Sequence, residues 1–154
     1  MEIACRGCLL RPLRPSDAPS LAAHANDRDV WLNLRDAFPH PYALADAVAY
    51  VAHVRRDPRP RRFGIVVDGE AVGTIGLVPG DDIARATAEI GYWLGRPYRG
   101  RGIATEAVRA VTRHAHATLG MHRVFAVPFV AIPRRAACWR RPATRARAAC
   151  GGAR

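Results

Sequence analysis

The sequence predicts a single α/β (α+β) domain built on a mixed, mostly antiparallel sheet that is flanked by helices. Its 154 residues suffice for one sizeable hydrophobic core and are short for two. Two β-rich runs meet at Asp68-Gly69, which is a strong signal for a two-residue hairpin. Farther along, a Gly-rich loop at 95–102 opens directly into a helical pattern at 103–119. These observations predict an antiparallel meander that ends in a strand, a loop and a helix.

The N-terminal part carries a strand signal followed by a helix signal. Leu9 to Leu13 predicts a short strand, and a helix follows with Ser16 or Asp17 as its N-cap. Residues 38–42 contain two prolines, so we expect an extended connector there.

A second helix is predicted over 44–51, because apolar residues recur there at helical spacing. We expect its buried face to consist of Leu44, Val48 and Val51 or Ala52. The charged stretch 55–62 contains two prolines and predicts a loop.

The predicted meander has three strands. Runs 63–67 and 71–78 flank the hairpin signal and should pair antiparallel, and 88–94 follows them after a turn. Gly91 interrupts the third run, which indicates a bulge or a close backbone approach.

The last predicted elements are a helix and a strand. Gly120 is placed to end the helix at 103–119 in the C′ position, and residues 122–129 predict one more strand. The helix carries an apolar stripe at i, i+4 spacing, which consists of Ala107, Val111, Ala115 and Leu119.

The formal net charge of +11 is spread unevenly along the chain. Residues 130–154 hold seven Arg and no acidic residue, so subtracting these seven charges leaves +4 for residues 1–129. All 24 basic side chains are Arg, and Ala, Gly and Pro are abundant, as a GC-rich coding sequence would produce. Arginine content is therefore weak support for a nucleic-acid partner.

The cysteines bear on compartment and on metal binding. No secretory signal precedes Cys5, and no apolar run is long enough to span a bilayer, so we expect a reducing cytoplasm and no membrane partner. Cys5-x-x-Cys8 has the spacing of half a zinc site, but a second closely spaced pair of Cys or His is missing. We therefore expect no metal. The remaining cysteines are Cys138 and Cys150.

The strand, loop and helix of 88–119 carry the strongest functional signal. Glycines at alternate loop positions let several backbone N–H groups converge on an anion, and the helix N-terminus adds partial positive charge. Phosphate binding is one interpretation, and an ordinary strand-to-helix turn is the other. The loop lacks the Lys-Ser/Thr of a P-loop and the Gly-x-Gly-x-x-Gly of a dinucleotide site.

A family resemblance favours phosphate binding. The segment Arg99-Gly100-Arg101-Gly102-Ile103-Ala104 resembles the GNAT N-acetyltransferase pattern of Gln or Arg, two residues, Gly, one residue, and Gly or Ala. The flanks are similar as well, since 88–94 looks like the family's fourth strand and 102–107 like the start of its following helix. Segments 10–18 and 38–42 resemble the branch that acetylates the N-termini of ribosomal proteins.

The resemblance covers residues 8–129 and implies a GNAT fold that transfers an acetyl group from acetyl-CoA to a primary amine in a ternary complex. The acceptor would be a protein N-terminal amine or a small-molecule amine, and the protein a monomer or homodimer. The pantetheine arm would run beside Tyr92, Trp93 and Leu94. The backbone groups implied to hold the pyrophosphate are those of Arg99, Gly100, Arg101, Gly102, Ile103 and Ala104.

The implied reaction needs a proton acceptor, because a free alkyl amine has a pKa of about 10.4 and attacks only when neutral. Glu89 is the candidate base, since it lies on the strand beside the expected cofactor opening and shares a strand face with Gly91 and Trp93. The alternative is that Glu89 is a polar residue on a half-exposed strand or pairs with an Arg.

Aromatic residues and histidines give weaker signals. Trp31, Phe38 and Tyr42 are candidate residues of the acceptor pocket, although aromatic residues at such positions also build cores. His114 and His116 lie two positions apart on the predicted helix and hence on different faces, and we expect them at the surface.

Residues 130–154 lack the ending that the family leads us to expect, which is a helix with Arg-Val-Leu-Glu-Lys-x-Gly-Phe/Tyr and a strand with Glu-Gly. Synonymous codons for 136–144, read from the third base, permit Arg-Val-Leu-Glu-Lys-Ala-Gly-Tyr-Ala. The same register over 145–152 permits Arg-Glu-Gly-Arg-Leu-Arg-Arg. We therefore predict a frameshift near 129–132 and an aberrant tail that is poorly ordered or helical only in short pieces. Such a tail buries little apolar surface, so we expect a destabilised, weakly active or inactive chain.

Three functions remain open from the sequence. The first is an acetyl-CoA-dependent N-acetyltransferase, and the second is a catalytically impaired remnant that at most binds acetyl-CoA. The third is an Arg-rich nucleic-acid-binding protein. The third is weakest, because the excess charge lies mostly in 130–154 and no basic platform with interleaved aromatic residues is present.

Overall fold

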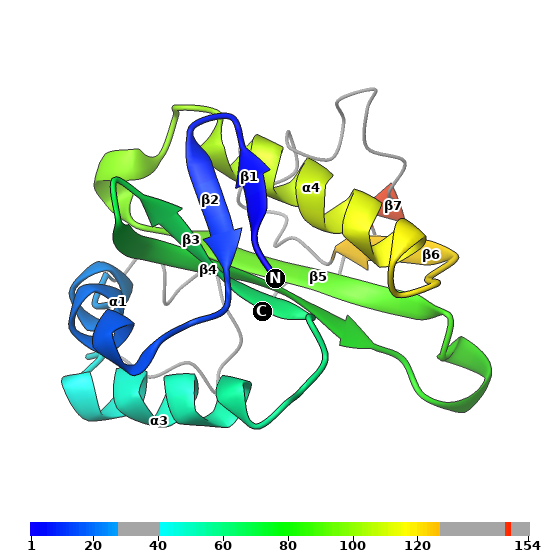
Figure 1. Cartoon of the computed structure of the whole chain (residues 1–154), viewed down its shortest axis with the longest axis horizontal. Helices are drawn as coiled ribbons and strands as arrows, with labels where there is room; N and C mark the ends of the chain where they lie inside the picture. Colours follow the sequence, from blue (N-terminus) through cyan, green and yellow to red (C-terminus); the bar gives the residue numbers. More distant parts are fainter. Residues whose placement is uncertain (28–40, 127–146, 149–154) are drawn as a thin grey trace.

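A mixed sheet forms the centre of the computed structural model, which describes residues 1–27, 41–126 and 147–148 (Figure 1). Within these residues the strands are Ile3–Cys5 (β1), Cys8–Arg11 (β2), Arg62–Val67 (β3), Glu70–Pro79 (β4), Thr87–Leu94 (β5), Arg123–Ala126 (β6) and Arg147–Ala148 (β7). They lie side by side in chain order. Neighbours from β1 to β5 pair antiparallel, whereas β5–β6 and β6–β7 pair parallel. The predicted mixed, mostly antiparallel sheet is confirmed.

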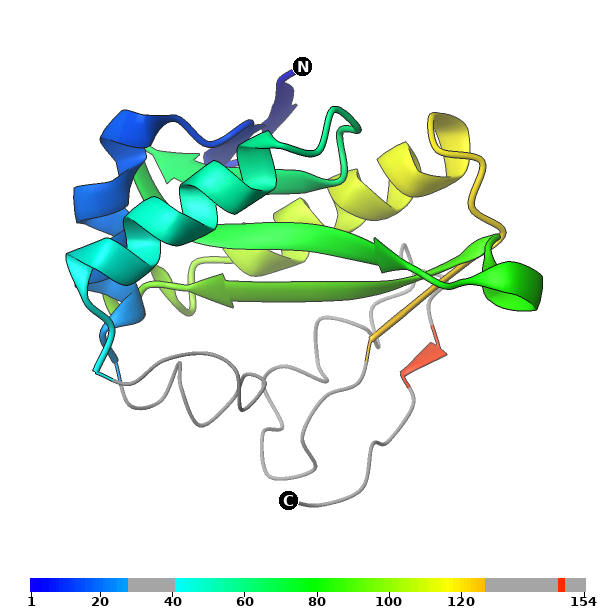
Figure 2. The same cartoon turned by 90° about the horizontal axis from the view of Figure 1, so that it is seen from below.

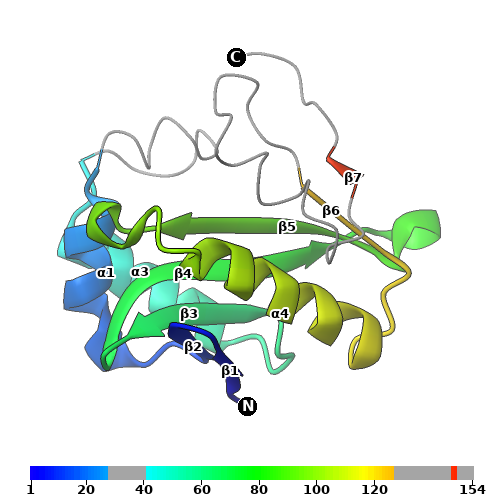
Figure 3. The same cartoon turned by 90° about the horizontal axis from the view of Figure 1, so that it is seen from above.

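Helices cover both faces of the sheet. Helices α1 (Ala18–Ala25) and α3 (Leu44–Arg55) lie on one face, and α4 (Ile103–Ala117) lies on the other, as Figures 2 and 3 show from opposite sides. Helix α4 connects β5 to β6, and this crossover allows the two strands to run parallel. Single 3₁₀ turns complete the described chain at Pro15–Asp17 (η1), Asp82–Ala84 (η2) and Arg96–Tyr98 (η3).

The hairpin between β3 and β4 forms at the predicted dipeptide. Asp68 and Gly69 have φ angles of 50° and 79°, and two positive φ angles are the signature of a type I′ turn. The predicted bulge at Gly91 is wrong, because this residue stands in regular register opposite Gly76 of β4. The register instead shifts between β3 and β4, where Ile65 pairs with Gly73 and Val66 with Ala71, so that Val72 of β4 is the extra residue.

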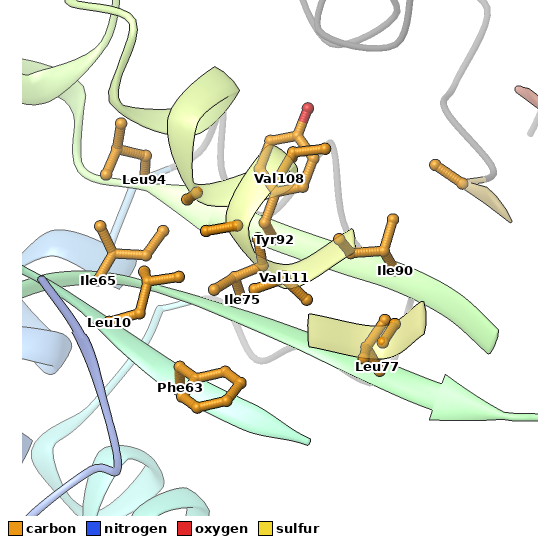
Figure 4. Close-up of a cluster of buried hydrophobic side chains, with 14 of the residues drawn as sticks. Leu10, Phe63, Ile65, Ile75, Leu77, Ile90, Tyr92, Leu94, Val108 and Val111 are labelled. Atoms are coloured by element: carbon orange, nitrogen blue, oxygen red, sulfur yellow. The ribbon is translucent and has the colours of Figure 1, made fainter. Parts of the chain in front are cut away.

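The larger core cluster fills the space between the sheet and α4. Figure 4 shows side chains of β2 to β5 meeting those of α4, for example Ile75 and Tyr92 beside Val108 and Val111. The predicted stripe of α4 is confirmed for Ala107, Val111 and Ala115, which are fully buried, and Leu119 packs at its margin.

A second core cluster lies between the opposite face and helices α1 and α3. The predicted buried face of α3 is wrong in part, because Leu44 and Val48 are each 53% exposed. The helix turns Ala47, Val51 and Val54 inward. The side chain of Ala47 is small and fully buried, so α3 can approach its neighbours closely. The close packing of this face favours its burial over the face with the larger side chains of Leu44 and Val48.

Asp17 is the N-cap residue of α1, as predicted, although its side chain makes no capping bond to that helix. Its carboxylate instead accepts bonds from Arg11 Nη1 at 2.7 Å and Nη2 at 2.8 Å, and from the Arg14 backbone N–H at 2.7 Å. This buried ion pair ties β2 to the start of α1.

The C-terminal elements differ in extent from the sequence prediction. Helix α4 ends at Ala117 with Thr118 as C-cap, so Gly120, with a φ of 65°, lies beyond the C′ position that we predicted for it. Strand β6 is described over Arg123–Ala126, and 127–129 lie outside the described residues. Most of 130–154 also lies outside the described residues, so the prediction that this tail is poorly ordered stays a prediction. In the described part of the chain, no helix combines the length and apolar character needed to cross a bilayer.

Candidate functional site

The loop between β5 and α4 is shaped by two glycines. Gly100 and Gly102 have φ angles of 78° and 79°, a left-handed conformation that residues with a Cβ adopt only at a cost. Apart from the glycine itself and its two chain neighbours, no described residue has an atom within 4 Å of the position that a Cβ would take at either residue. The loop therefore presents open backbone on its outer side.

Helix α4 begins at this loop without a side-chain cap. Gly102 is the N-cap residue, and its carbonyl accepts the first helical bond from the Glu106 N–H at 3.1 Å. The partial positive charge of the helix N-terminus thus adds to the open backbone of the loop. This combination favours an anionic group such as a phosphate.

Strands β5 and β6 pair only over the first part of β5 and then separate. Their ladder pairs Thr87 with Arg123, Ala88 with Val124 and Glu89 with Phe125. Strand β5 then continues to Leu94, while β6 runs away from it at an angle (Figures 2 and 3).

Glu89 lies in the last rung of this ladder, where the two strands part. Burial alternates along β5, so that Ile90, Tyr92 and Leu94 face the core beneath α4. Glu89, Gly91 and Trp93 therefore share the opposite face, as predicted. The Glu89 side chain is half-buried.

The loop is fastened to the end of α1 by a cluster that the sequence did not reveal. Asp27 accepts bonds from Arg96 Nε at 3.0 Å and Arg96 Nη2 at 3.1 Å, and Arg99 Nη2 lies 3.8 Å from the same carboxylate. Arg99 Nε also donates to the Leu94 carbonyl at 3.0 Å. Asp27 and Arg99 together connect α1, the loop and the end of β5.

His24 forms a second contact between α1 and the loop. Its ring packs edge-on against Tyr98 with centroids 5.5 Å apart, and its Nε2 lies 3.0 Å from Glu70 Oε1. A Cβ at Gly95 would lie 2.6 Å from His24 Nδ1, so only glycine permits this approach. The sequence signal for the cluster is slight, because Asp27 and His24 stand about 70 positions before the loop residues they contact.

Comparison with known proteins assigns the family. Residues 8–130 match the model of the Acetyltransferase (GNAT) domain, which is most of the chain. This chain belongs to the GNAT acetyltransferase family. The family and the named relatives identify the enzyme class of the GNAT domain as acetyl-CoA-dependent N-acetyltransferase.

Two curated relatives illustrate the similarity. The Bacillus subtilis protein named Probable N-acetyltransferase YjcK is 31% identical over 123 residues, which cover 75% of this chain and 67% of that protein. Spermidine N(1)-acetyltransferase of Escherichia coli is 29% identical over 122 residues, which cover 77% of this chain and 62% of that protein. The chain thus spans about two thirds of the length of these two relatives.

Solved structures share the fold at lower identity. Mycobacterium smegmatis RimJ in complex with CoA-disulfide superposes with a TM-score of 0.77 and 23% identity, over 90% of this chain and 71% of that one. RimL, a ribosomal L7/L12 alpha-N-protein acetyltransferase in complex with coenzyme A, gives 0.76 and 20%, over 91% and 81%. The predicted GNAT fold is therefore confirmed.

The predicted cofactor residues of the GNAT domain occupy different environments. Tyr92, Leu94 and Ile103 are buried in the core, Trp93 and Arg99 are half-buried, and the guanidinium of Arg101 lies over the Tyr98 ring at 5.4 Å. The structure brings together the end of β5, the loop and the start of α4. The remaining predicted residues are two loop glycines and one helical residue. The glycines, Gly100 and Gly102, border the open side of the loop, and Ala104 lies in the first turn of α4.

The predicted acceptor residues are only partly described. Trp31 and Phe38 lie outside the described residues. Tyr42 is buried in the second core cluster, and its N–H donates to Asn26 Oδ1 at 3.0 Å. Burial, with smaller contributions from Tyr50 and Asp46, raises the pKa of Tyr42 to about 12, so its hydroxyl stays protonated at neutral pH.

One histidine prediction is wrong. His116 is exposed as expected, but His114 is only 5% exposed. Its Nε2 donates to the Pro60 carbonyl at 2.7 Å, and its ring packs edge-on against Phe63. His114 therefore anchors the 55–62 loop to α4 from within the core.

Proposed function

We propose that the GNAT domain transfers the acetyl group of acetyl-CoA to a primary amine by direct attack in a ternary complex. The observation that carries the proposal is the open, left-handed backbone at Gly100 and Gly102, which leads into the uncapped N-terminus of α4. A Cβ at either glycine would fill the space in front of the loop. The loop therefore fits a pyrophosphate that approaches the backbone closely.

The residues that would hold the cofactor follow from this placement. Backbone N–H groups between Arg99 and Ala104 would bind the pyrophosphate, and the segment Tyr92 to Leu94 would lie along the pantetheine arm. Arg99 is engaged with Asp27 and the Leu94 carbonyl, so its side chain holds the loop in place. Bound acetyl-CoA supplies an activated acetyl thioester.

Glu89 is the proposed proton acceptor for the attacking amine, directly or through a water. Its support is its position at the point where β5 and β6 separate. A Glu89→Gln variant should lose about 10²-fold in kcat and lose the base-dependent limb of its pH profile. A Glu2→Gln variant, which makes the same change at a largely exposed carboxylate near the N-terminus, serves as control and should keep both. Equal loss in the two variants would assign Glu89 to a structural ion pair or an exposed polar position.

Two acceptor classes are proposed for the same site. RimL is named for a ribosomal-protein N-terminus and the Escherichia coli relative for spermidine, so a peptide N-terminal amine and a polyamine are the acceptors to compare. Trp31, Phe38 and Tyr42 remain the candidate residues of the acceptor pocket. Thiol release measured over both acceptors ranks them by kcat/KM.

We further propose that residues 130–154 are read out of frame, which implies a GNAT domain of 8–129 followed by an aberrant tail. The match to the family model ends at residue 130, where the expected shift lies. The codons of the gene test this directly, because codons that cannot encode the shifted motif exclude a frameshift.

One experiment separates the candidate functions. Calorimetric titration with acetyl-CoA is followed by a thiol-release assay with the amine panel. Binding with turnover supports the proposal, and binding without turnover identifies an impaired remnant. Absence of binding, together with a salt-dependent shift of DNA in a gel, would revive the nucleic-acid reading.

A further inference from the structure

The hairpin of β1 and β2 places two cysteines directly opposite each other. Cys5 is the last residue of β1, Cys8 is the first residue of β2, and the two are register partners. Arg6 and Gly7 form the turn between them, with a φ of 83° at Gly7 alone, as in a type II turn. Directly opposite residues of antiparallel strands have Cα atoms about 4.5–5.5 Å apart, and disulfides need about 4.4–6.8 Å. The backbone therefore already has disulfide spacing.

The two sulfur atoms are close and chemically available. Both cysteines are free thiols, and each affects the pKa of the other, as expected for side chains that lie side by side. Cys5 Sγ also donates to the Ile3 carbonyl at 3.7 Å. Each is half-buried, and Cys8 is among the residues that line a surface pocket of about 500 Å³. A small molecule that enters this pocket can therefore reach the pair.

Metal binding does not account for this pair in the described residues. No group of three or more His, Cys, Asp and Glu side chains has the arrangement of a metal site there. Two facing thiols can instead undergo thiol–disulfide exchange, which needs no further ligand.

The hairpin rests on the start of α4. A Cβ built at Gly7 would lie 3.8 Å from Ile103 Cγ1, and the charges of Glu106 and Arg113 on α4 act on Cys5. β1 is the edge strand of the sheet. A covalent bridge across the hairpin would therefore fix β1 and β2 to each other at this edge of the sheet.

We propose that Cys5 and Cys8 form a dithiol–disulfide redox site that is oxidised by low-molecular-weight disulfides. One cysteine thiolate attacks the small disulfide and forms a mixed disulfide, releasing one thiolate. The second cysteine thiolate then attacks the bridged cysteine sulfur, forms the Cys5–Cys8 bond and releases the other thiolate. The cysteines lose two protons and two electrons, and the small disulfide becomes two thiols.

The environment of the thiols sets the pace of this exchange. Burial raises the pKa of Cys5, and burial together with the neighbouring Cys5 raises the pKa of Cys8 to about 12. The reactive thiolate is therefore scarce at neutral pH. The rate of oxidation should rise about tenfold per pH unit between neutral pH and the thiol pKa.

The test uses the full chain and oxidised glutathione, followed by alkylation and trypsin. Trypsin cuts after Arg6, which separates residues 1–6 from 7–28, because the two intervening Arg residues precede proline. The proposal expects these peptides to remain joined, two hydrogens lighter than their sum, and to separate with dithiothreitol. Separate alkylated or glutathionylated peptides, or a bridge to Cys138 or Cys150, would overturn it.

Variants control for the remaining thiols and for folding. A chain with Cys138→Ser and Cys150→Ser should still give the joined peptides, at a rate that follows the same pH dependence. Cys5→Ser should give only a glutathione adduct on Cys8, and Cys8→Ala only an adduct on Cys5. Hydrogen exchange over 3–11 should slow on oxidation of the natural chain and not in either single variant. If hydrogen exchange over 3–11 did not change on oxidation, the disulfide would not stabilise the hairpin, which would contradict this part of the proposal.

Discussion

Replacing Asp17 with Ala should destabilise the fold more than any change to a surface ion pair. Asp17 and Arg11 have side chains that are 7% and 6% exposed, and two nitrogen–oxygen contacts of 2.7 and 2.8 Å join them. The variant leaves the Arg11 guanidinium buried with only the Pro12 carbonyl as a bonded partner in the described chain. It also removes the acceptor of the Arg14 N–H.

Breaking a buried ion pair by removing one partner costs roughly 3–5 kcal/mol. In a chain of this size each kcal/mol shifts Tm by about 2–4 °C, so the melting temperature should fall by about 6–20 °C. Thermal and urea unfolding, followed by far-ultraviolet circular dichroism, measures the change. The double variant Arg11→Met/Asp17→Leu should recover most of the loss, because it leaves no charge unpaired.

Asp57 provides a matched control. It also accepts two bonds from one arginine, Arg61 at 2.6 and 3.0 Å, and one from a backbone N–H, that of Arg59 at 3.0 Å. Its side chain is 25% exposed, so Asp57→Ala should cost about 1 kcal/mol or less. Equal losses in the two variants would refute the argument that burial sets the magnitude.

Four further predictions follow from the described residues. Burial alone would raise the pKa of Asp17, but its hydrogen bonds to Arg11 and Arg14 and their positive charges lower the pKa below its usual value. The ion pair should therefore stabilise the fold above pH about 4, and this contribution should be lost as the pH falls below that value. Unfolding measured as a function of pH should show this loss in the natural chain and not in Asp17→Ala. Gly102→Ala should cost about 1–2 kcal/mol of stability for its left-handed backbone and raise the calorimetric Kd for acetyl-CoA. Asp27→Asn, which loosens the loop, should raise the KM for acetyl-CoA several-fold in steady-state kinetics while Tm falls only slightly, since Arg96 is largely exposed. Val48→Ser should change Tm by no more than about 2 °C in calorimetry, because the side chain is 53% exposed, and a larger fall would show that Val48 has an apolar partner.

Local patterns predicted the parts of the fold that depend on neighbouring residues. The Asp68-Gly69 hairpin follows from turn chemistry, and the i, i+4 stripe of α4 follows from an unbroken apolar period. The loop at 99–104 was also found from the sequence, because its glycines and its strand and helix flanks are contiguous.

Features that depend on distant residues could not be predicted from local patterns. Helix α3 has two apolar stripes that share Val51, and only the packing of Ala47 against the neighbouring elements selects one. The burial of His114 depends on the Pro60 carbonyl, 54 positions away. The contact of Asp27 with Arg96 spans 69 positions and carries no periodic signal.

The agreement between strand order and chain order has a consequence for how the domain folds. Each strand pairs with the next one in the chain. The sequence separation is short for β1–β2, β3–β4 and β4–β5, whereas α1 and α3 lie between β2 and β3, and α4 lies between β5 and β6. Pairs of short sequence separation form fastest, because they close the shortest loops. During synthesis the sheet can grow from β3 to β5 before β6 has left the ribosome, with α4 as the next element to dock. The proposed frameshift would therefore act late in folding, at the growing edge of a sheet whose earlier strands are already paired.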